Sequence, residues 1–368
     1  MDIIVQRDAL LKPLQAVSGV VEKKQTLPIL SNVLLTVKDG NLLLTGTDLE
    51  IELVGFVAIE KLSAEGSVTV SARKLFDICR TLPENTAVSL TLEKNHLVVK
   101  TGSSRFLLNT LSPQDFPSLE DMEYSVEFPL NQSQFKQLMT KTYFAMGQQD
   151  VRHYLNGSFL DINQNSVKCI AADGHRLALA EIQDERIGNA TAKVILPRKS
   201  VLELIRLLGN DTEQDAKISI GESRFRIVTP EFIFTSKLIN AQYPDYNRLI
   251  PKGSTTSATG ERESIKQALT RASILSNEKF RGVRFQFEDS KLRITANNSD
   301  QEHAEEAVDL DYAGNTLEIG FNVAYLLDVV SAITTKLIRC TFTDSNNGVL
   351  IEPADGDQSL YVVMPMRL

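Results

Sequence analysis

The sequence LLLTGTD at residues 42–48 returns in altered form as VKCIAAD at 167–173 and as LRITANN at 292–298. Each copy is an apolar strand pattern that ends on Asp or Asn, and successive copies lie 125 residues apart. The pair Arg73-Lys74, which opens an apolar helical stretch, recurs 125 residues later as Arg198-Lys199. Self-similarity at a fixed period indicates a repeated architecture.

The length of the chain fits three copies of one domain. Its 368 residues give about 123 per copy, an ordinary size for a domain with its own core. Phe116-Pro117 and Tyr243-Pro244 end the first and second copies. We therefore predict domains at residues 1–122, 123–251 and 252–368. Apolar residues make up 42% of the chain and charged residues 23%, which is typical of a folded protein.

Each copy shows the same order of expected elements. Its first half begins with an amphipathic helix pattern, at 9–17, 135–146 and 265–275. Strand patterns follow at 29–37 and 42–57, at 155–162 and 167–182, and at 283–288 and 292–308. Its second half repeats this order of elements, with helices at 74–82, 199–208 and 322–333 and short strands at 88–92, 218–220 and 338–342. Six helices alternating with six antiparallel sheet groups predict an α+β fold.

Several classes of protein lack support in this sequence. Three widely spaced cysteines, Cys79, Cys169 and Cys340, favour core packing over a disulfide framework or a zinc site. No apolar run approaches the roughly 18 residues of a membrane span, and the N-terminus has no secretion pattern, so we expect a cytoplasmic protein. We find no glycine-rich phosphate loop, nucleophile elbow or close histidine pair, and expect no metal or cofactor.

One short stretch could suggest catalysis. Asp173-Gly174-His175-Arg176 places an acid, a base and a cation in succession. Neighbouring side chains on a strand point to opposite faces, so these groups cannot easily converge on one atom. We therefore favour a non-catalytic role for this stretch.

The charge of the chain is unevenly distributed. The net charge is −8, but the helical stretches counted with their flanking residues (7–20, 72–82, 132–146, 198–208, 262–276 and 322–334) together carry +8, which leaves −16 for the rest. Only the helix at 322–334 is net negative. An acidic shell with basic helices could admit a phosphate backbone along one surface and repel it elsewhere. Helices also commonly carry Lys and Arg as solvated faces, so charge alone leaves both interpretations open.

Ten strings spread over the whole chain resemble one family, the beta subunit (sliding clamp) of bacterial DNA polymerase III. They are TLPILSNVLL (26–35), GTDLE (46–50), ARKLFDICR (72–80), QDVRHYLNG (149–157), ADGHRLA (172–178), FIFTSKL (232–238), ILSNEKFRGVR (274–284), ITANN (294–298), IGFNVAYLLDV (319–329) and YVVMPMRL (361–368). The resemblance implies a head-to-tail homodimeric ring of six processivity-fold domains, with helices lining the hole and antiparallel sheets outside.

The function implied by the resemblance is that of a DNA processivity factor. Such a ring encircles double-stranded DNA without reading its sequence and needs no catalytic residues. The implied partners are the polymerase III alpha subunit, the delta subunit of the clamp loader, and other polymerases and repair proteins that bind through short Gln/Leu/Phe peptides. Two alternatives remain open: a scaffold of the same domains that does not encircle DNA, and, more remotely, an enzyme acting through Asp173 and His175.

The resemblance also nominates residues for DNA binding and for the dimer interface. The implied DNA contacts are Lys24, Arg73, Gln149, Arg152, His153, Tyr154, Arg198 and Lys199, with Arg80, Arg206 and Arg281 as secondary candidates. His153 stands where the family often has tyrosine. The implied interface pairs the strand at 105–111 with the edge at 297–308 and contains Lys74, Arg105, Phe106, Leu108, Ile274, Leu275, Asp300, Glu302, Glu305 and Glu306. Ser103 and His303 depart from the charged residues often found there.

A third set of residues is implied to form a partner-peptide groove. The terminal stretch Tyr361 to Leu368 is apolar, and two methionines beside a proline suit an adaptable surface shared by several partners. The groove residues are Leu155, Gly174, His175, Arg176, Leu177, Pro244, Arg248, Leu249, Asn322, Tyr325, Val362, Met364, Pro365, Met366 and Arg367. Ala172, Asn346 and Gly348 vary from the family pattern at groove positions.

Overall fold

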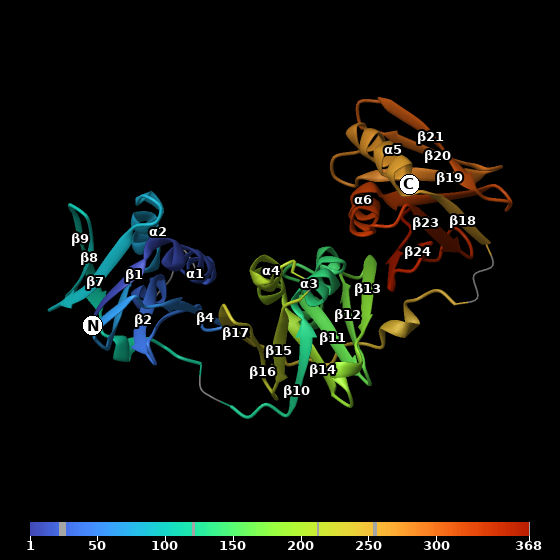
Figure 1. Ribbon diagram of the computed structural model, residues 1–368. Coiled ribbons are helices and arrows are strands. Elements are labelled where there is room, and N and C mark those ends of the chain that lie inside the picture. The colour runs from blue at the N-terminus through green and yellow to red at the C-terminus, as the bar shows by residue number, and fades with distance from the viewer. Residues whose placement is uncertain (22–26, 120–121, 212, 253–255, 368) are drawn as a thin grey trace. The chain divides into compact units, whose positions relative to one another are not determined.

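The computed structural model describes residues 1–21, 27–119, 122–211, 213–252 and 256–367. The chain forms two compact units, which we call the first unit (residues 1–132 and 206–238) and the second unit (133–205 and 239–368). Each unit contains one continuous antiparallel sheet, of 13 strands in the first and 12 in the second. Figure 1 shows helices packed on the sheets in each part of the chain.

The elements follow the three copies seen in the sequence. The first copy contains β1 (Asp2–Gln6), α1 (Arg7–Val20), β2 (Asn32–Lys38), β3 (Asn41–Thr47), β4 (Ile51–Ala58), β5 (Lys61–Ala64), β6 (Gly66–Ser71), α2 (Ala72–Thr81), β7 (Ala87–Glu93), β8 (His96–Thr101) and β9 (Ser104–Leu111). The second contains β10 (Val126–Asn131), α3 (Gln132–Thr140), β11 (Gly157–Asn163), β12 (Ser166–Ala172), β13 (Arg176–Gln183), β14 (Thr191–Pro197), α4 (Arg198–Leu207), β15 (Asp215–Ile220), β16 (Arg224–Val228) and β17 (Phe232–Lys237). The third contains β18 (Thr256–Glu261), α5 (Arg262–Ile274), β19 (Gly282–Glu288), β20 (Lys291–Asn297), β21 (His303–Asp311), β22 (Leu317–Asn322), α6 (Val323–Ala332), β23 (Leu337–Phe342), β24 (Val349–Pro353) and β25 (Ser359–Val363). Short 3-10 turns lie between them: η1 (Pro28–Ser31), η2 (Pro113–Asp115), η3 (Tyr143–Ala145), η4 (His153–Leu155), η5 (Glu185–Ile187) and η6 (Tyr246–Arg248).

The period of 125 residues has a local structural cause. Each of β3, β12 and β20 ends at an Asp or Asn that caps the turn to the next strand. Asp48 Oδ1 accepts hydrogen bonds from two backbone N–H groups, those of residues 50 and 51, at 2.9 and 2.7 Å. Asp173 Oδ1 does the same with residues 175 and 176, and Asn298 Oδ1 with residues 300 and 302. A short side chain with an acceptor oxygen is suited to this turn, which explains why these positions repeat.

A second repeated device joins the two helices of each copy. Arg7 at the start of α1 donates to the carbonyls of Cys79 and Arg80 at the end of α2. Arg198, at the start of α4, donates to the carbonyls of residues 143 and 146, beyond the end of α3. Arg262, at the start of α5, donates to the carbonyls of residues 330 and 335, around the end of α6. Each guanidinium thus adds a donor to carbonyls at or just beyond a helix end, where the helix itself supplies few donors.

The six predicted helices are present, with two differences of detail. The pattern at 135–146 predicted one helix, but α3 ends at Thr140 and a separate turn, η3, follows. The hydroxyls of Thr140 and Thr142 bond back to carbonyls four residues earlier, which weakens a helix by competing for its backbone groups. The patterns at 42–57, 167–182 and 292–308 each predicted one strand. The turns at Asp48, Asp173 and Asn298 divide them into β3 and β4, β12 and β13, and β20 and β21. The short strands directly before each helix were not predicted.

The sheets are continuous because copies join edge to edge. In the first unit, β17 of the second copy pairs with β4, with Phe232 opposite Gly55. In the second unit, β25 of the third copy pairs with β13, with Leu177 opposite Val362. By the repeat, β4, β13 and β21 are corresponding strands, and so are β9, β17 and β25. Among the described strands, β21 pairs with β20 and, at its end, with β18, and β9 pairs with β8 and, at its end, with β6. Neither strand takes part in a joint like β4–β17 or β13–β25.

The cysteines lie in or near the cores, as predicted. Cys79 and Cys169 are fully buried, and burial raises the pKa of their thiols to about 12 and about 11. Thiols with such raised pKa values stay protonated and are poor nucleophiles. All three cysteines are free, Cys340 being partly buried.

We predict that Gly157→Ala destabilises the β11–β14 pair. A Cβ atom at Gly157 would lie 2.3 Å from the carbonyl oxygen of Leu196 on the paired strand, so the backbones must separate. Such overpacking typically costs about 1–3 kcal/mol. Hydrogen exchange of the β11 and β14 amides should accelerate accordingly. Gly209→Ala is the matched control, because its Cβ would have no atom nearer than 3.8 Å; equal exchange in both variants would contradict the prediction.

Candidate partner-binding site

A cavity of about 480 Å³ lies in the second unit where β13 pairs with the terminal strand β25. Nine of the fifteen residues implied by the family resemblance surround it. The full lining consists of Arg152, Tyr154, Leu155, Ala172, Gly174, Arg176, Leu177, Pro244, Asp245, Arg248, Leu249, Val362 and Met364. These residues come from four segments far apart in the sequence, so folding of the second unit creates the cavity.

The floor of this cavity is apolar and rigid. Leu155, Ala172, Leu177 and Val362 are at most 5% exposed and belong to one core cluster. Phe159 and Tyr243 stack in this cluster with ring centroids 4.6 Å apart. The floor is therefore preformed, as expected of a binding pocket.

Arg176 fixes one wall of the cavity. Its guanidinium donates to Asp173 at 3.0 Å, to Asp328 of α6 at 2.6 Å and to the carbonyl of Phe144 at 2.6 Å. It also lies over the ring of Tyr325, 4.4 Å from the centroid. A side chain with this many partners, 10% exposed, holds β13, α6 and η3 together.

Arg152 forms another part of the wall. It makes a two-point ion pair with Asp150, at 3.0 and 2.8 Å, and this pair lowers the pKa of Asp150 to about 2. Its guanidinium also packs on Gly174, where a Cβ atom would lie only 2.8 Å away. Gly174 has φ +90°, a conformation that favours glycine, so the backbone selects glycine there.

The rim of the cavity is exposed and combines charged side chains, such as Arg248, with the apolar side chains of Leu249 and Met364. Met364 is 45% exposed, and its backbone N–H donates to the carbonyl of His175 at 2.8 Å. Leu249 and the Arg248 side chain, on the opposite segment, are 54% and 85% exposed. Exposed apolar side chains around a buried apolar floor suit a partner that covers both.

The remaining predicted groove residues do not line this cavity. His175 and Tyr325 stack with ring centroids 6.2 Å apart, beside Arg176. Asn322 caps the start of α6 by accepting from the N–H of Ala324. Met366 and Arg367 line a separate cavity of about 420 Å³ with residues of β19 and β20, and Pro365 lines neither cavity.

The predicted DNA contacts fall into three groups. Arg73 and Arg80 on α2 are exposed, at 77% and 62%, and both pair with Asp77. Gln149 and His153 are exposed in the segment before β11. Among the others, Arg152 and Tyr154 line the cavity. Arg198 donates to carbonyls beyond α3, Arg206 donates to the carbonyl of Ala16, and Lys199 takes part in an interaction within the chain. Lys24 lies outside the described residues. Arg281 occupies a turn with φ +53°.

The predicted interface residues also divide. Ile274 at the end of α5 is 74% exposed, whereas Leu108 is 7% exposed and packs within its own chain. On β9 the exposed apolar side chains are Leu107 and Leu111, at 50% and 44%. Phe106 and Leu275 are partly buried, and Lys74 and Asp300 are exposed. The other charged residues have partners in the chain: Arg105 with Glu93, Glu302 with Asn298, Glu305 with Arg293, and Glu306 with Arg271.

Sequence reasoning did not predict the place of three cavity residues. Asp245 was not named, although its side chain caps the turn η6 by accepting from the N–H of Asn247. An Asp directly after Tyr243-Pro244 is a turn signal that could have pointed to it. The family resemblance implies DNA contacts at Arg152 and Tyr154, and both side chains line the cavity.

Two features are absent from the described residues. Among the described residues, no group of three or more His, Cys, Asp or Glu could hold a metal ion. No described helix combines the length and apolarity that a membrane crossing requires.

Comparisons with known proteins agree along the whole chain. Models of the N-terminal, central and C-terminal domains of the DNA polymerase III beta subunit match residues 1–120, 129–245 and 247–367. The chain is 50% identical to the beta sliding clamp of Pseudomonas aeruginosa and 47% identical to that of Escherichia coli strain K12, each over the full length of both proteins. A crystal structure of the Pseudomonas aeruginosa sliding clamp bound to griselimycin has a TM-score of 0.97 at 49% identity, covering all of both chains. The chain therefore belongs to the beta-subunit family of DNA polymerase III, the sliding clamps.

Proposed function

We propose that this protein is a homodimeric DNA sliding clamp that encircles duplex DNA in the cytoplasm and tethers a replicative polymerase. The observation that carries the proposal is the full-length match to sliding clamps together with a preformed apolar cavity beside the chain terminus. A clamp needs no catalytic residues, because processivity follows from the topological link between ring and DNA. The family is accordingly that of a non-catalytic subunit.

The cavity is the proposed docking site for partner peptides. Its apolar floor suits a leucine or phenylalanine side chain, and its polar rim can orient a peptide backbone. The relative with bound griselimycin supports the idea that clamps of this fold take a ligand. We propose the polymerase alpha subunit, the loader delta subunit, and other polymerases and repair proteins as the partners, each presenting a short Gln/Leu/Phe peptide.

The unmatched strand edges support a head-to-tail dimer. Since β17 joins β4 and β25 joins β13, the same pairing between β9 of one chain and β21 of another closes the repeat. Two different edges at the two ends of a chain make a heterologous contact, which can close into a ring. The exposed Leu107 on β9 and Ile274 beside β21 then supply apolar contacts across the interface.

The DNA surface is proposed to be the set of basic helices. Contacts to phosphates do not depend on sequence, which is what a clamp that moves along DNA requires. Arg73 and Arg80, the two arginines of α2, can turn toward a phosphate because both are exposed: Arg73 forms a surface ion pair with Asp77, and Arg80 pairs with Asp77 and lies over the Phe76 ring.

The clamp function predicts retention on circular DNA. After loading by its cognate loader, the protein should stay on a nicked circle and run off once the circle is cut. Ile274→Ala with Leu275→Ala should give a folded monomer in sedimentation and no retention, because the exposed apolar contact of α5 is lost. Leu202→Ala, an exposed leucine on α4, is the control and should remain dimeric. Equal loss from circular and cut DNA by the wild type would contradict encirclement.

The partner site predicts a difference between two methionines. Met364→Ala should weaken binding of a polymerase-derived peptide by about tenfold, because a half-buried methionine contributes on the order of 1.5 kcal/mol of apolar contact. Met366→Ala should leave affinity unchanged, since Met366 lines a different cavity. Deletion of residues 364–368 should abolish binding while the dimer persists. Calorimetric titration measures all three, and full affinity in the deletion would place the partner site elsewhere.

The DNA surface predicts a change in salt dependence. Replacing Lys24, Arg73 and Lys199 by Ala should weaken DNA binding equally for any sequence, and the slope of log K against log salt should flatten by roughly 0.9 for each lost contact. Replacing Lys38, Lys61 and Lys291, which are exposed on strands or at strand ends, removes the same charge and serves as control. An equal effect of both triples would show that net charge, and not the helical surface, governs binding.

A further inference from the structure

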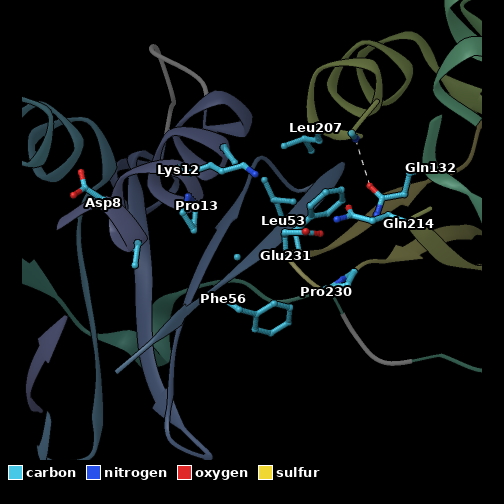
Figure 2. A pocket seen from close by; sticks show the side chains of 15 residues that line it. Asp8, Lys12, Pro13, Leu53, Phe56, Gln132, Leu207, Gln214, Pro230 and Glu231 are labelled. Carbon is cyan, nitrogen blue, oxygen red and sulfur yellow. Dashed lines mark hydrogen bonds between the residues drawn. The ribbon is translucent and has the colours of Figure 1, made fainter. Parts of the chain in front are cut away.

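A second cavity, of about 340 Å³, lies in the first unit at the joint between β4 and β17. It corresponds in the repeat to the joint between β13 and β25, where the proposed partner site lies, but the two cavities share no residue. Figure 2 shows it between α1 on one side and Gln132, Leu207 and Gln214 on the other. Its volume is at the lower end of the range of small-ligand pockets, about 300–1,000 Å³.

One polar group in its wall lacks a partner. Gln132 is 2% exposed, and its Oε1 accepts a hydrogen bond from the N–H of Gly209 at 3.4 Å. Its Nε2 has no hydrogen-bond partner. A buried donor without an acceptor is costly, so native proteins rarely leave one unless something else satisfies it. In Figure 2 the Gln132 amide lies across the cavity from Lys12 and Pro13.

The opposite wall carries a second irregular group. Pro13 lies inside α1 and has no N–H, so the carbonyl of Ala9 lacks the donor that a helix normally provides four residues later. Ala9 and Pro13 both line the cavity. Gly55 of β4 lets the strand approach this helix, because a Cβ atom there would lie 2.9 Å from the Pro13 ring.

The space between these groups is mainly apolar. Leu53 is fully buried, Phe232 is 6% exposed, and Ala16, Phe56 and Leu207 add further apolar surface. A single bridging water needs only about 10–15 Å³ of such space, so one water cannot fill the cavity. The occupant that fits has an apolar body and also an acceptor for Gln132.

We propose that this cavity is a second binding site, which takes one uncharged apolar residue from a peptide segment of a partner protein. A peptide supplies an apolar side chain together with one C=O and one N–H for each residue. The side chain packs on Leu53 and Phe232, and the backbone C=O accepts from Gln132 Nε2. The N–H faces the turn of α1 at Ala9. This site is independent of the cavity beside the chain terminus.

The test uses N-acetyl-leucine amide as the probe and the full-length protein in solution. Binding is measured by ligand-observed NMR and by the shift of the side-chain NH₂ signals of Gln132. We expect saturable binding to the wild type. Ala9→Leu, which fills the cavity from α1, should abolish it, and Gln132→Met, which removes the donor with little change of shape, should weaken it about tenfold. Gln15→Leu places a leucine on α1 outside the cavity lining and should bind as the wild type does.

Each other outcome overturns the proposal. No binding by the wild type, with unmoved Gln132 signals, shows a cavity filled by water only. Unchanged binding by Ala9→Leu places the probe elsewhere, and loss of binding on deletion of residues 364–368 assigns it to the terminal cavity. Equal affinity of Gln132→Met and wild type would show that the Gln132 donor takes no part in binding. The circular dichroism of each variant, matched to the wild type, excludes misfolding as the cause of lost binding.

Discussion

Backbone pairing between the last strand of one copy and the fourth strand of the preceding copy is the constraint on which the structure depends. The pairs β4–β17 and β13–β25 each make the sheet continuous across two copies. Unpaired strand edges invite association, so every such joint removes an edge that would otherwise be open. In a tandem array of copies, this pairing covers every matching strand edge except one in the first copy and one in the last copy. The dimer proposed above follows from applying the same rule once more, between chains.

Small side-chain devices keep the three copies alike although their sequences differ. The turn after β3, β12 and β20 needs one acceptor oxygen, and either Asp or Asn supplies it. The helix pair needs a long cationic donor at the start of one helix, and Arg7, Arg198 and Arg262 supply it from different positions within the copy. The turn residues therefore recur at a fixed interval of 125 residues, because the turn fixes the backbone register. The arginines do not recur at that interval, because a guanidinium can contact the carbonyls at a helix end from more than one position in the copy.

The sequence was sufficient to predict the three copies, the α+β class and the six helices, because these follow from apolar periodicity and from repeated turn residues. The short strands before the helices carried too little pattern to be detected, and the end of α3 depended on hydroxyl bonds that periodicity does not report. Side-chain roles were harder. Arg198 is implied as a phosphate contact and, within the chain, holds two backbone carbonyls; Leu108 is implied as an interface residue and, within the chain, is 7% exposed. Charge and hydrophobicity indicate what a side chain can do, whereas its partner is decided by which segments the fold brings beside it.

The two cavities at corresponding joints suggest a physical reason why binding sites arise there. At a joint, backbone hydrogen bonds fix the distance between two strands, and the side chains around them come from two copies. Volume is left where these side chains do not fill the space between the copies, and its walls are held by the strand pairing. In the second unit this space has an apolar floor under an arginine network, and in the first it has an amide donor without a partner. A joint built for continuity of the sheet thus provides a rigid, partly apolar recess, which is the property that recognition of a short peptide requires.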